Sequence, residues 1–589
     1  MGKALEHGLR LAPAKLDVER RADGAMLLRS PQKLGRHARA VGEWLARWAR
    51  EAPERCFLAE RQGETWRKVS YREALALVRR VGQGLLDRGL DASRPVVILS
   101  DNSVDHALLA LGAMHVGVPV APISPAYSLM SKDFAKLKAI FELLRPGLVW
   151  TSDPEKFAPA LAAVGARPTP FAELLAAGTT PGVDEAFART GPDTVAKILF
   201  TSGSTGAPKG VINTQRMLTV NQEQYALVWP FLEDRPLVLV DWLPWNHTFG
   251  GNSNFCMMLR NGGTLHIDAG KPAPGLIETS VRNLKEISPT VYFNVPRGFD
   301  LLVPFLERDA GLRASFFRRL DLMVYAGAAL PQNLWERMQQ LALDERGSRV
   351  PLISAWGSTE TAPLATGVHY PVDRAGIIGL PVPGCELKLV PAAGKLEVRV
   401  KGPNVTPGYY GREDLTRAAF DEEGYYRIGD ALKFADPERP EQGLAFDGRI
   451  AEDFKLSTGT WVHVGSARVK LIAAGDPLIQ DAVITGHGRA EVGALVFLNA
   501  AAVKARGLDE AGVRDHLRAA MQKLAAETGS GSSTHPVRAL VVGEPPSIDA
   551  NEITDKGYIN QRAVLERRAA LVEKLHADSP NAEVILAIH

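Results

Sequence analysis

One stretch of the chain constrains its fold more than any other. Residues Ile198–Phe200 form an apolar run that predicts a buried strand, and residues 201–210 follow it as Thr-Ser-Gly-Ser-Thr-Gly-Ala-Pro-Lys-Gly. Glycines let consecutive backbone N–H groups turn toward one point without a Cβ clash, hydroxyls add donors, and Lys209 adds positive charge. Such a loop suits a polyphosphate. A flexible linker is the simpler alternative, but linkers seldom follow a buried strand and end in Pro-Lys-Gly.

The order of residues in this loop differs from the common P-loop. That motif places Lys directly after Gly and a hydroxyl residue directly after Lys, whereas here Pro208 precedes Lys209 and Gly210 follows it. The spacing resembles the phosphate-binding loop of the adenylate-forming superfamily, which includes acyl-CoA synthetases, peptide-synthetase adenylation domains and luciferases. The resemblance implies ATP binding by Thr201, Ser202, Gly203, Ser204, Thr205, Gly206 and Lys209.

Composition favours a multidomain protein that acts on small molecules. A chain of 589 residues, 46% of them hydrophobic, is longer than a single hydrophobic core normally supports, so two or more domains are expected. Balanced charge, net +2, indicates neither nucleic acid nor a membrane as a partner. Three scattered cysteines suit a reducing compartment, and residues 1–34 lack a signal-peptide core, so we expect a cytoplasmic protein. The oligomeric state is left open, with a homodimer as one option.

Alternating strand and helix patterns predict an α/β fold. Strands are expected at 95–99 and 147–150, with helical segments at 107–116 and 133–144 between them, which favours mostly parallel sheets flanked by helices. Residues 1–40 are expected to be irregular. Residues 158–185, rich in Ala, Pro, Gly and Thr, are expected to be a surface excursion.

The predicted secondary-structure pattern changes twice in the C-terminal half of the chain. Short strands from residue 386 predict a β-rich subdomain, and residues from about 450 predict a small α+β unit. We therefore expect an N-terminal domain over 1–448 and a C-terminal domain over 449–589. The family resemblance implies that the small domain is a mobile lid with a hinge near 449–452. Short strand candidates also end near residues 242, 294, 325 and 355, and ligands bind beyond such carboxyl ends.

A second motif, residues 355–360, reads Ala-Trp-Gly-Ser-Thr-Glu. It resembles the superfamily's aromatic-Gly-x-Thr-Glu element. The resemblance implies that Ala355, Trp356 and Gly357 flank adenine, that Thr359 contacts phosphate and that Glu360 holds Mg²⁺. Magnesium prefers hard oxygen ligands from one or two carboxylates and the nucleotide phosphates. A capped helix N-terminus is the structural alternative for the same residues.

Two further segments resemble the family's ribose site and hinge. Residues 425–430, Tyr-Tyr-Arg-Ile-Gly-Asp, imply that Asp430 accepts hydrogen bonds from the ribose hydroxyls. Arg449 is implied to lie near the ribose and to begin the hinge. Two residues later, where many relatives have Asp or Lys as the pivot, this chain has Ala451, so Glu452 is the alternative pivot.

The C-terminal segments imply the remaining chemistry. Lys556 is assigned as the catalytic lysine, although Asp555 replaces the usual preceding Gly and Gly557 follows. A mobile cation there would bring a carboxylate and an α-phosphate together and offset charge in the transition state. A solvated surface lysine is the alternative. The loop with Lys455, Ser457 and Gly459 is implied to face the CoA tunnel after domain rotation.

Acyl-pocket candidates lie between these motifs. His247 stands where the family has His or an aromatic residue beside the reacting carboxylate, and neighbouring aromatic residues suit a flat ring. The predicted pocket residues are Trp245, Asn252, Phe255, Tyr292, Asn294 and Tyr325. Gly327 and Ala328 resemble the adenine loop.

Together the motifs predict an acyl-CoA synthetase that uses ATP, Mg²⁺, coenzyme A and a carboxylic acid. Residues 447–462 and the Lys556 segment are most similar to bacterial feruloyl-CoA synthetases, which implies an aromatic, hydroxycinnamate-like acid. Benzoate or medium-chain acids, a carrier-protein acceptor, and a non-catalytic ligand-binding relative are the alternatives.

Overall fold

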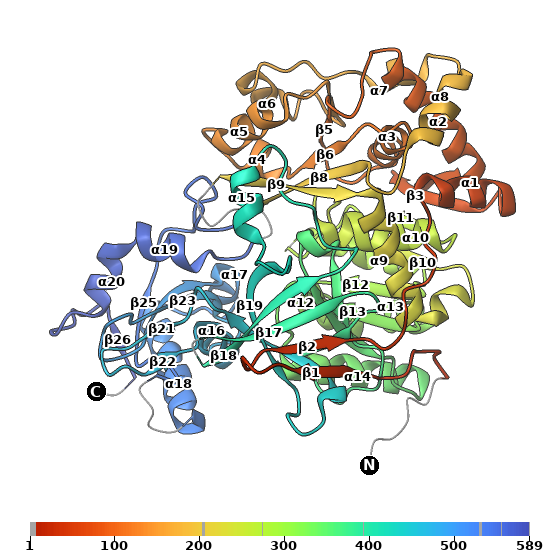
Figure 1. The fold of residues 1–589 in the computed structure, drawn as a ribbon. Helices are drawn as coiled ribbons and strands as arrows, with labels where there is room; N and C mark the ends of the chain where they lie inside the picture. The colour runs from red at the N-terminus through yellow and green to blue at the C-terminus, as the bar shows by residue number, and fades with distance from the viewer. Residues whose placement is uncertain are drawn as a thin grey trace.

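The computed structural model describes residues 8–202, 207–273, 275–392, 394–528, 533–554 and 557–587. It has a mixed α/β architecture, in which a large N-terminal domain built on sheets is joined to a smaller C-terminal domain (Figure 1). The predicted fold class is confirmed. None of the helices in these ranges combines the length and apolar composition needed to cross a bilayer.

The first sheet carries the predicted phosphate-binding hairpin. Its order is β7-β5-β6-β8-β9, with four parallel strands and an antiparallel β9. The strands span β5 Val96–Leu99, β6 Val120–Ile123, β7 Leu148–Thr151, β8 Val195–Ser202 and β9 Pro208–Thr214. β5, β6 and β7 are wholly buried, as expected of apolar runs in a parallel sheet. In the β8–β9 hairpin Thr201 pairs with Lys209. Gly203, Ser204, Thr205, Gly206 and the side chain of Ser202 lie outside the described residues.

Helices accompany this sheet, and three of them lie in or begin in the segment 158–185 that we expected to be a surface excursion. The helices of this region are α1 Gly42–Glu51, α2 Tyr71–Leu86, α3 Val104–His115, α4 Ala126–Leu129, α5 Ala135–Leu144, α6 Ala158–Ala163, α7 Phe171–Leu175 and α8 Pro181–Arg189. The last three occupy the predicted excursion 158–185. α8 forms there because the Thr180 side chain caps the helix and Pro181 occupies its first turn, where proline is tolerated.

Two other sheets complete the large domain. One has the order β10-β11-β3-β4, with β3 Cys56–Gln62, β4 Thr65–Ser70, β10 Val238–Asp241 and β11 Thr264–Ile267. The larger sheet, of eleven strands, has the order β1-β2-β17-β18-β19-β20-β16-β15-β14-β13-β12. Its parallel part comprises β12 Val291–Asn294, β13 Leu322–Tyr325 and β14 Leu352–Gly357. Its antiparallel part continues through β15 Leu364–Gly367, β16 Ile377–Pro381, β17 Glu386–Ala392, β18 Lys395–Lys401, β19 Tyr426–Phe434 and β20 Leu444–Arg449.

The remaining helices of the large domain pack around these two sheets. The α-helices are α9 Gln215–Val228, α10 Phe255–Arg260, α11 Ile277–Glu286, α12 Pro296–Arg308, α13 Ala310–Phe317, α14 Gln332–Arg346 and α15 Glu413–Ala419. The short helices are the 3-10 segments η1 Pro230–Glu233, η3 Thr359–Thr361 and η4 Pro440–Gln442, and the π-helix η2 Phe249–Asn254.

The N-terminal segment is not irregular throughout. β1 Asp17–Arg20 and β2 Met26–Arg29 form an antiparallel ribbon, and β2 pairs with β17. This pairing joins residues far apart in the sequence, so no local pattern predicts it. Three buried residues of β2, Met26–Leu28, supply the apolar surface that holds the ribbon at the sheet edge.

The C-terminal domain has a core of its own, formed by buried residues between Phe454 and Ala587. Its sheet has the order β23-β24-β25-β26, with β23 Ile479–Thr485, β24 Gly493–Leu498, β25 Arg538–Val541 and β26 Ile585–Leu586. A separate hairpin consists of β21 Phe454–Lys455 and β22 Trp461–Val462. The helices are α16 Val464–Ala474, α17 Ala500–Ala505, α18 Glu510–Thr528, α19 Gln561–Arg567 and α20 Ala569–Leu575.

Candidate active site

Glu360 lies just beyond the end of β14, in the short helix η3, and its side chain is held by tyrosines. The Tyr409 hydroxyl donates to Glu360 Oε1 at 3.1 Å, and the Tyr409 and Tyr426 hydroxyl oxygens are 3.3 Å apart. Thr359, Glu360 and both tyrosines are buried. Burial, together with the nearby carboxylate, raises the pKa of Tyr409 and Tyr426, so both phenols stay protonated and able to donate.

The same tyrosine connects Glu360 to the predicted phosphate-binding hairpin. Val211 of β9 forms an isolated bridge with Tyr409, and Tyr410 N donates to Gly210 O at 2.8 Å. Lys209 Nζ lies 5.3 Å from the centroid of the Tyr409 ring, within the range of a cation–π contact. Two residues predicted separately, Lys209 and Glu360, therefore contact the same aromatic side chain, Lys209 over its ring and Glu360 at its hydroxyl.

The environment of Glu360 fits a magnesium ion. Its recorded side-chain partners are neutral hydroxyls, and within the described ranges no lysine or arginine forms an ion pair with it. A buried carboxylate without a cationic partner is an oxygen ligand of the kind that Mg²⁺ accepts alongside nucleotide phosphates.

Asp430 forms the second polar centre. Trp356 Nε1 donates to Asp430 Oδ2 at 3.1 Å, and Arg449 Nε lies 3.4 Å from Oδ1, paired across β19 and β20. Oδ1 is buried and accepts no hydrogen bond from the described residues. Burial raises the pKa of Asp430, and the Arg449 charge opposes this shift. A carboxylate oxygen with free acceptor capacity suits a donor such as a sugar hydroxyl.

The predicted adenine loop lies at the carboxyl end of β13. Gly327 has φ +87°, a conformation that favours glycine, and Ala328 beside it is exposed. Ala355 is half-buried at the end of the neighbouring β14, where Gly357 leaves no room for a Cβ atom against the carbonyl of Pro363. These residues place an open backbone surface beside the Trp356–Asp430 pair.

The six predicted acyl-pocket residues are all buried, and each has packing or hydrogen-bonding partners. Asn252 Nδ2 donates to Asn213 Oδ1 at 2.8 Å and to Thr248 Oγ1 at 3.1 Å. Trp245 and Phe255 contact each other edge to face, with ring centroids 5.0 Å apart, and Tyr292 packs against two phenylalanines. Tyr325 accepts a hydrogen bond from Gly376 N, and Asn294 bonds with Trp242 and Tyr292. Their assignment to an acyl pocket stays a prediction.

Asn252 differs from these residues because its side-chain oxygen has no hydrogen-bond partner in the described ranges. It lies in the π-helix η2, a type of distortion frequent at functional sites. The buried Lys197 donates to Gly251 O in this helix at 2.6 Å, and Gly251 N donates to His247 O at 2.8 Å. The half-buried His247 is thus supported by a lysine that lies in an apolar strand and that sequence reasoning missed.

The residues predicted to face the CoA tunnel are not brought to this site. Lys455 and Ser457 lie in the exposed β21–β22 hairpin, where Lys455 Nζ is 5.0 Å from the Trp461 ring centroid. Gly459 occupies the hairpin turn with φ +81°. At the predicted hinge Ala451 is exposed, whereas burial raises the pKa of the half-buried Glu452. Lys556 lies outside the described residues.

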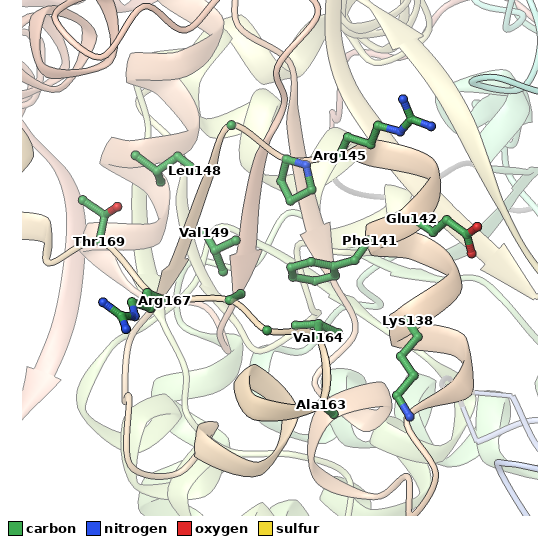
Figure 2. Close-up of a pocket in the computed structure, with 14 residues that line it drawn as sticks. Lys138, Phe141, Glu142, Arg145, Leu148, Val149, Ala163, Val164, Arg167 and Thr169 are labelled. Atoms are coloured by element: carbon green, nitrogen blue, oxygen red, sulfur yellow. The ribbon is translucent and has the colours of Figure 1, made fainter.

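A separate surface pocket lies between α5 and the start of β7 (Figure 2). It encloses about 700 Å³, with an apolar centre formed by Phe141, Val149 and Val164 and charged side chains directed outward from it. None of the predicted site residues lines it.

Two family profiles match the chain. One, described as AMP-binding enzyme, matches residues 45–410. The chain belongs to the AMP-binding enzyme family. The second profile, AMP-binding enzyme C-terminal domain, matches residues 456–580.

Individual relatives are distant. A carboxylic acid reductase of Segniliparus rugosus is 24% identical over 414 residues, which are 66% of this chain and 33% of the reductase, so the chain spans about a third of that protein. A 3-hydroxybenzoate–CoA ligase of an Aromatoleum species is 26% identical over 458 residues, 71% of this chain and 79% of the ligase. ATP-bound MatB of Rhodopseudomonas palustris has a TM-score of 0.67 at 22% identity, covering 90% of this chain and all of MatB, which shows the shared fold.

Proposed function

We propose that this protein is an ATP-dependent ligase that activates a carboxylic acid as its acyl-adenylate and transfers the acyl group to coenzyme A. The observation that carries the proposal is the proximity of Lys209, Glu360 and Asp430. Lys209 and Glu360 both contact Tyr409. Asp430, bound by Trp356, lies close enough to Glu360 that the Glu360 charge adds to burial in raising the pKa of Asp430. A bound Mg·ATP requires a cation near its phosphates, a carboxylate that holds the metal and a carboxylate that accepts from the ribose hydroxyls. Lys209, Glu360 and Asp430 supply these three groups in turn.

In the first half-reaction the substrate carboxylate attacks the α-phosphorus of ATP, and the bond to pyrophosphate breaks. The β8–β9 hairpin with Lys209 binds the leaving pyrophosphate, and Asp430 with Arg449 fixes the ribose. Lys556 bridges the carboxylate and the α-phosphate. Glu360 would hold Mg²⁺, which when bound neutralises phosphate charge. In the second half-reaction the CoA thiolate attacks the acyl carbonyl, and AMP leaves with the bonding electron pair.

The two half-reactions use two orientations of a C-terminal domain that we assign to 449–589, with a hinge near 449–452. The described structure supports the adenylating orientation, because the chain around Ile548 and Tyr558 lies against the large domain while Gly459 is exposed. Rotation would exchange Lys556 for the Gly459 hairpin. Opening and reclosing of this kind often limits turnover.

An aromatic acid of the feruloyl or hydroxycinnamate type is the proposed substrate. Support comes from the similarity of residues 447–462 to the sequences of feruloyl-CoA synthetases, and from the similarity of the chain to a 3-hydroxybenzoate–CoA ligase. Benzoates and medium-chain acids remain alternative substrates, because an apolar wall discriminates weakly between apolar groups of similar size. A cytoplasmic location, expected from the cysteine usage and from residues 1–34, stays a prediction, as does a homodimer.

A substrate panel tests the function. The purified protein is given Mg·ATP and ferulate, 4-coumarate, benzoate or octanoate, and AMP formation is measured with and without CoA. We expect AMP and acyl-CoA to form together, most rapidly with a hydroxycinnamate. AMP release that requires a carrier protein would favour the alternative acceptor. No pyrophosphate release with any acid would favour a non-catalytic ligand-binding relative.

A further inference from the structure

Tyr558, a residue of the C-terminal domain, reaches the candidate site. Tyr558 lies in a narrow hairpin in which Ile553 pairs with Ile559 and Thr554 N donates to Tyr558 O at 2.8 Å. Tyr558 N in turn donates to Thr554 Oγ1 at 3.1 Å. These bonds fix the backbone of Tyr558 and therefore the direction of its side chain.

This hairpin is anchored firmly in its own domain. The Glu552 carboxylate is fully buried and pairs with Arg567 and Arg568, and it also accepts a hydrogen bond from Ser547 N at 2.9 Å. A buried carboxylate with several charge-assisted partners holds a defined geometry. The hairpin therefore moves with the C-terminal domain as one unit.

The segment before the hairpin is docked on the large domain. Ile548 belongs to the apolar cluster of the first sheet, together with Ile198 and Phe200 of β8. Lys132 N donates to Asp549 Oδ2 at 3.0 Å, and Lys136 Nζ donates to Ile548 O at 2.5 Å. One apolar contact and two polar contacts thus fix the hairpin against the sheet that carries the phosphate-binding strand.

The result is that the Tyr558 hydroxyl faces the predicted adenine loop. A Cβ atom placed on Gly327 would lie 3.1 Å from the Tyr558 hydroxyl oxygen and 3.8 Å from Val295 Cγ1. The ring is half-buried, and its hydroxyl has no hydrogen-bond partner among the described residues. A donor held over an open glycine backbone, beside an apolar side chain, can contact a ligand that crosses this loop.

We propose that Tyr558 is a substrate-contacting residue of the adenylating state, and that its hydroxyl donates a hydrogen bond to an oxygen of the acyl-adenylate where this ligand crosses the Gly327 loop. This inference rests on the proposed function. Because Tyr558 belongs to the C-terminal domain, it leaves the site when that domain rotates. Its contribution is therefore confined to the first half-reaction.

The test compares Tyr558→Phe and Tyr558→Ala with a matched control, Tyr370→Phe. Tyr370 is a half-buried tyrosine of the large domain whose hydroxyl donates to Gln442 O, outside the site. ATP–pyrophosphate exchange reports the first half-reaction, and CoA-dependent AMP release from supplied acyl-AMP reports the second. Binding of a non-hydrolysable acyl-sulfamoyl adenosine is measured as a third readout.

We expect Tyr558→Phe to slow exchange and to weaken analogue binding by about tenfold or more, the size of a lost hydrogen bond to a charged group. Tyr558→Ala should lose more, while thioester formation from acyl-AMP and all three readouts of Tyr370→Phe stay near wild type. Unchanged exchange in Tyr558→Phe, or equal loss in both half-reactions, would overturn the inference alone. A wild-type protein without any exchange would instead remove the proposed function, and the inference with it.

Discussion

The Tyr409 hydroxyl and the Glu360 carboxylate are joined by a 3.1 Å hydrogen bond that links the predicted metal ligand to the phosphate-binding hairpin. Outer-shell partners that orient a ligand commonly change metal affinity by about 10–100-fold. We therefore expect Tyr409→Phe to raise the Mg²⁺ concentration needed for half-maximal pyrophosphate exchange by about tenfold, with a smaller effect at saturating Mg²⁺. The neighbouring Tyr410→Phe is the matched control. Equal Mg²⁺ requirements in the two variants would contradict this role of Tyr409.

The different roles assigned to Lys556 and Lys209 give a second prediction. Lys556→Ala should lower adenylation by about two to three orders of magnitude, as does loss of one transition-state donor in other enzymes. Thioester formation from acyl-AMP should be spared. Lys209→Ala should cost less, because Lys209 is assigned only to the leaving pyrophosphate. The control variant is Lys523→Ala, which removes one positive charge at an exposed lysine of α18. If Lys209→Ala abolished adenylation while Lys556→Ala left it intact, the assignment of roles would be reversed.

The exposed Gly459 turn gives the opposite prediction. Gly459→Leu should block thioester formation from acyl-AMP while pyrophosphate exchange survives, because the added side chain would obstruct the proposed CoA tunnel only after rotation. Gly507→Leu is a matched control, since Gly507 is also in the C-terminal domain, has φ +62° and has open space where a Cβ would stand. Both variants carry similar backbone strain. A loss of thiolation in both would indicate strain rather than a tunnel.

The strands around the site could be predicted because each is a short apolar run. Ile198–Phe200 lie buried in β8 and Leu322–Tyr325 lie buried in β13, each on a strand with a parallel neighbour, as apolar runs predict. The β1–β2 ribbon could not be predicted in this way, because it depends on pairing with residues more than 350 positions away. Local patterns carry no information about such partners.

The site itself was only partly predictable. Glu360 and Asp430 belong to sequence motifs and were predicted from them. Tyr409 and Tyr558 were identified only from their contacts in the structure, with Glu360 and with the Gly327 loop respectively. The Gly408-Tyr409-Tyr410 sequence, which follows the alternating strand Lys395–Lys401, was the available signal for the first of these. Aromatic composition does not by itself separate a pocket wall from a core. Tyr292 and Phe255 have the residue types of a ring-binding wall and also belong to hydrophobic clusters, so their place in an acyl pocket stays a prediction.

A buried ion pair connects the large domain to the segment after the predicted hinge. Lys395 of β18 pairs with Asp453, both side chains are 4% exposed, and Lys395 Nζ also donates to Asp447 O at 2.6 Å. Lys395→Met should destabilise the protein by about 3–5 kcal/mol, because it leaves a buried carboxylate with His463 as its remaining side-chain partner.

The nearby Lys433→Met is the matched control for this ion pair. Lys433 is largely exposed, so breaking its 2.8 Å pair with Asp447 should cost at most about 1 kcal/mol. Urea unfolding of both variants measures the difference. The double variant Lys395→Met with Asp453→Asn should recover part of the loss, since the unpaired charge is removed. Equal destabilisation by Lys395→Met and Lys433→Met would show that burial of the first pair has no energetic consequence.

Asp241, the last residue of β10, gives a prediction about pH. Burial raises its pKa to about 7 from 3.8, and Asp268 adds to the shift, while hydrogen bonds from Asn254 and Leu243 N oppose it. Because the folded-state pKa exceeds the unfolded one, folding takes up a proton between about pH 4 and pH 7, and stability falls as pH rises through that window. Above pH 7 the cost of the buried charge is on the order of 4 kcal/mol.

Asp241→Asn removes the cost of the buried charge. It does so only at high pH, because at low pH the wild-type Asp241 carboxyl is already neutral. The Asn254 side-chain oxygen, which has no partner among the described residues, can accept from the new amide after a flip of Asn254. We expect the melting temperature of the variant to exceed that of the wild type at pH 8 and to match or fall below it at pH 5, as measured by calorimetry at both values. If the wild type and the variant lost the same stability between pH 5 and pH 8, another group would be responsible for the pH dependence.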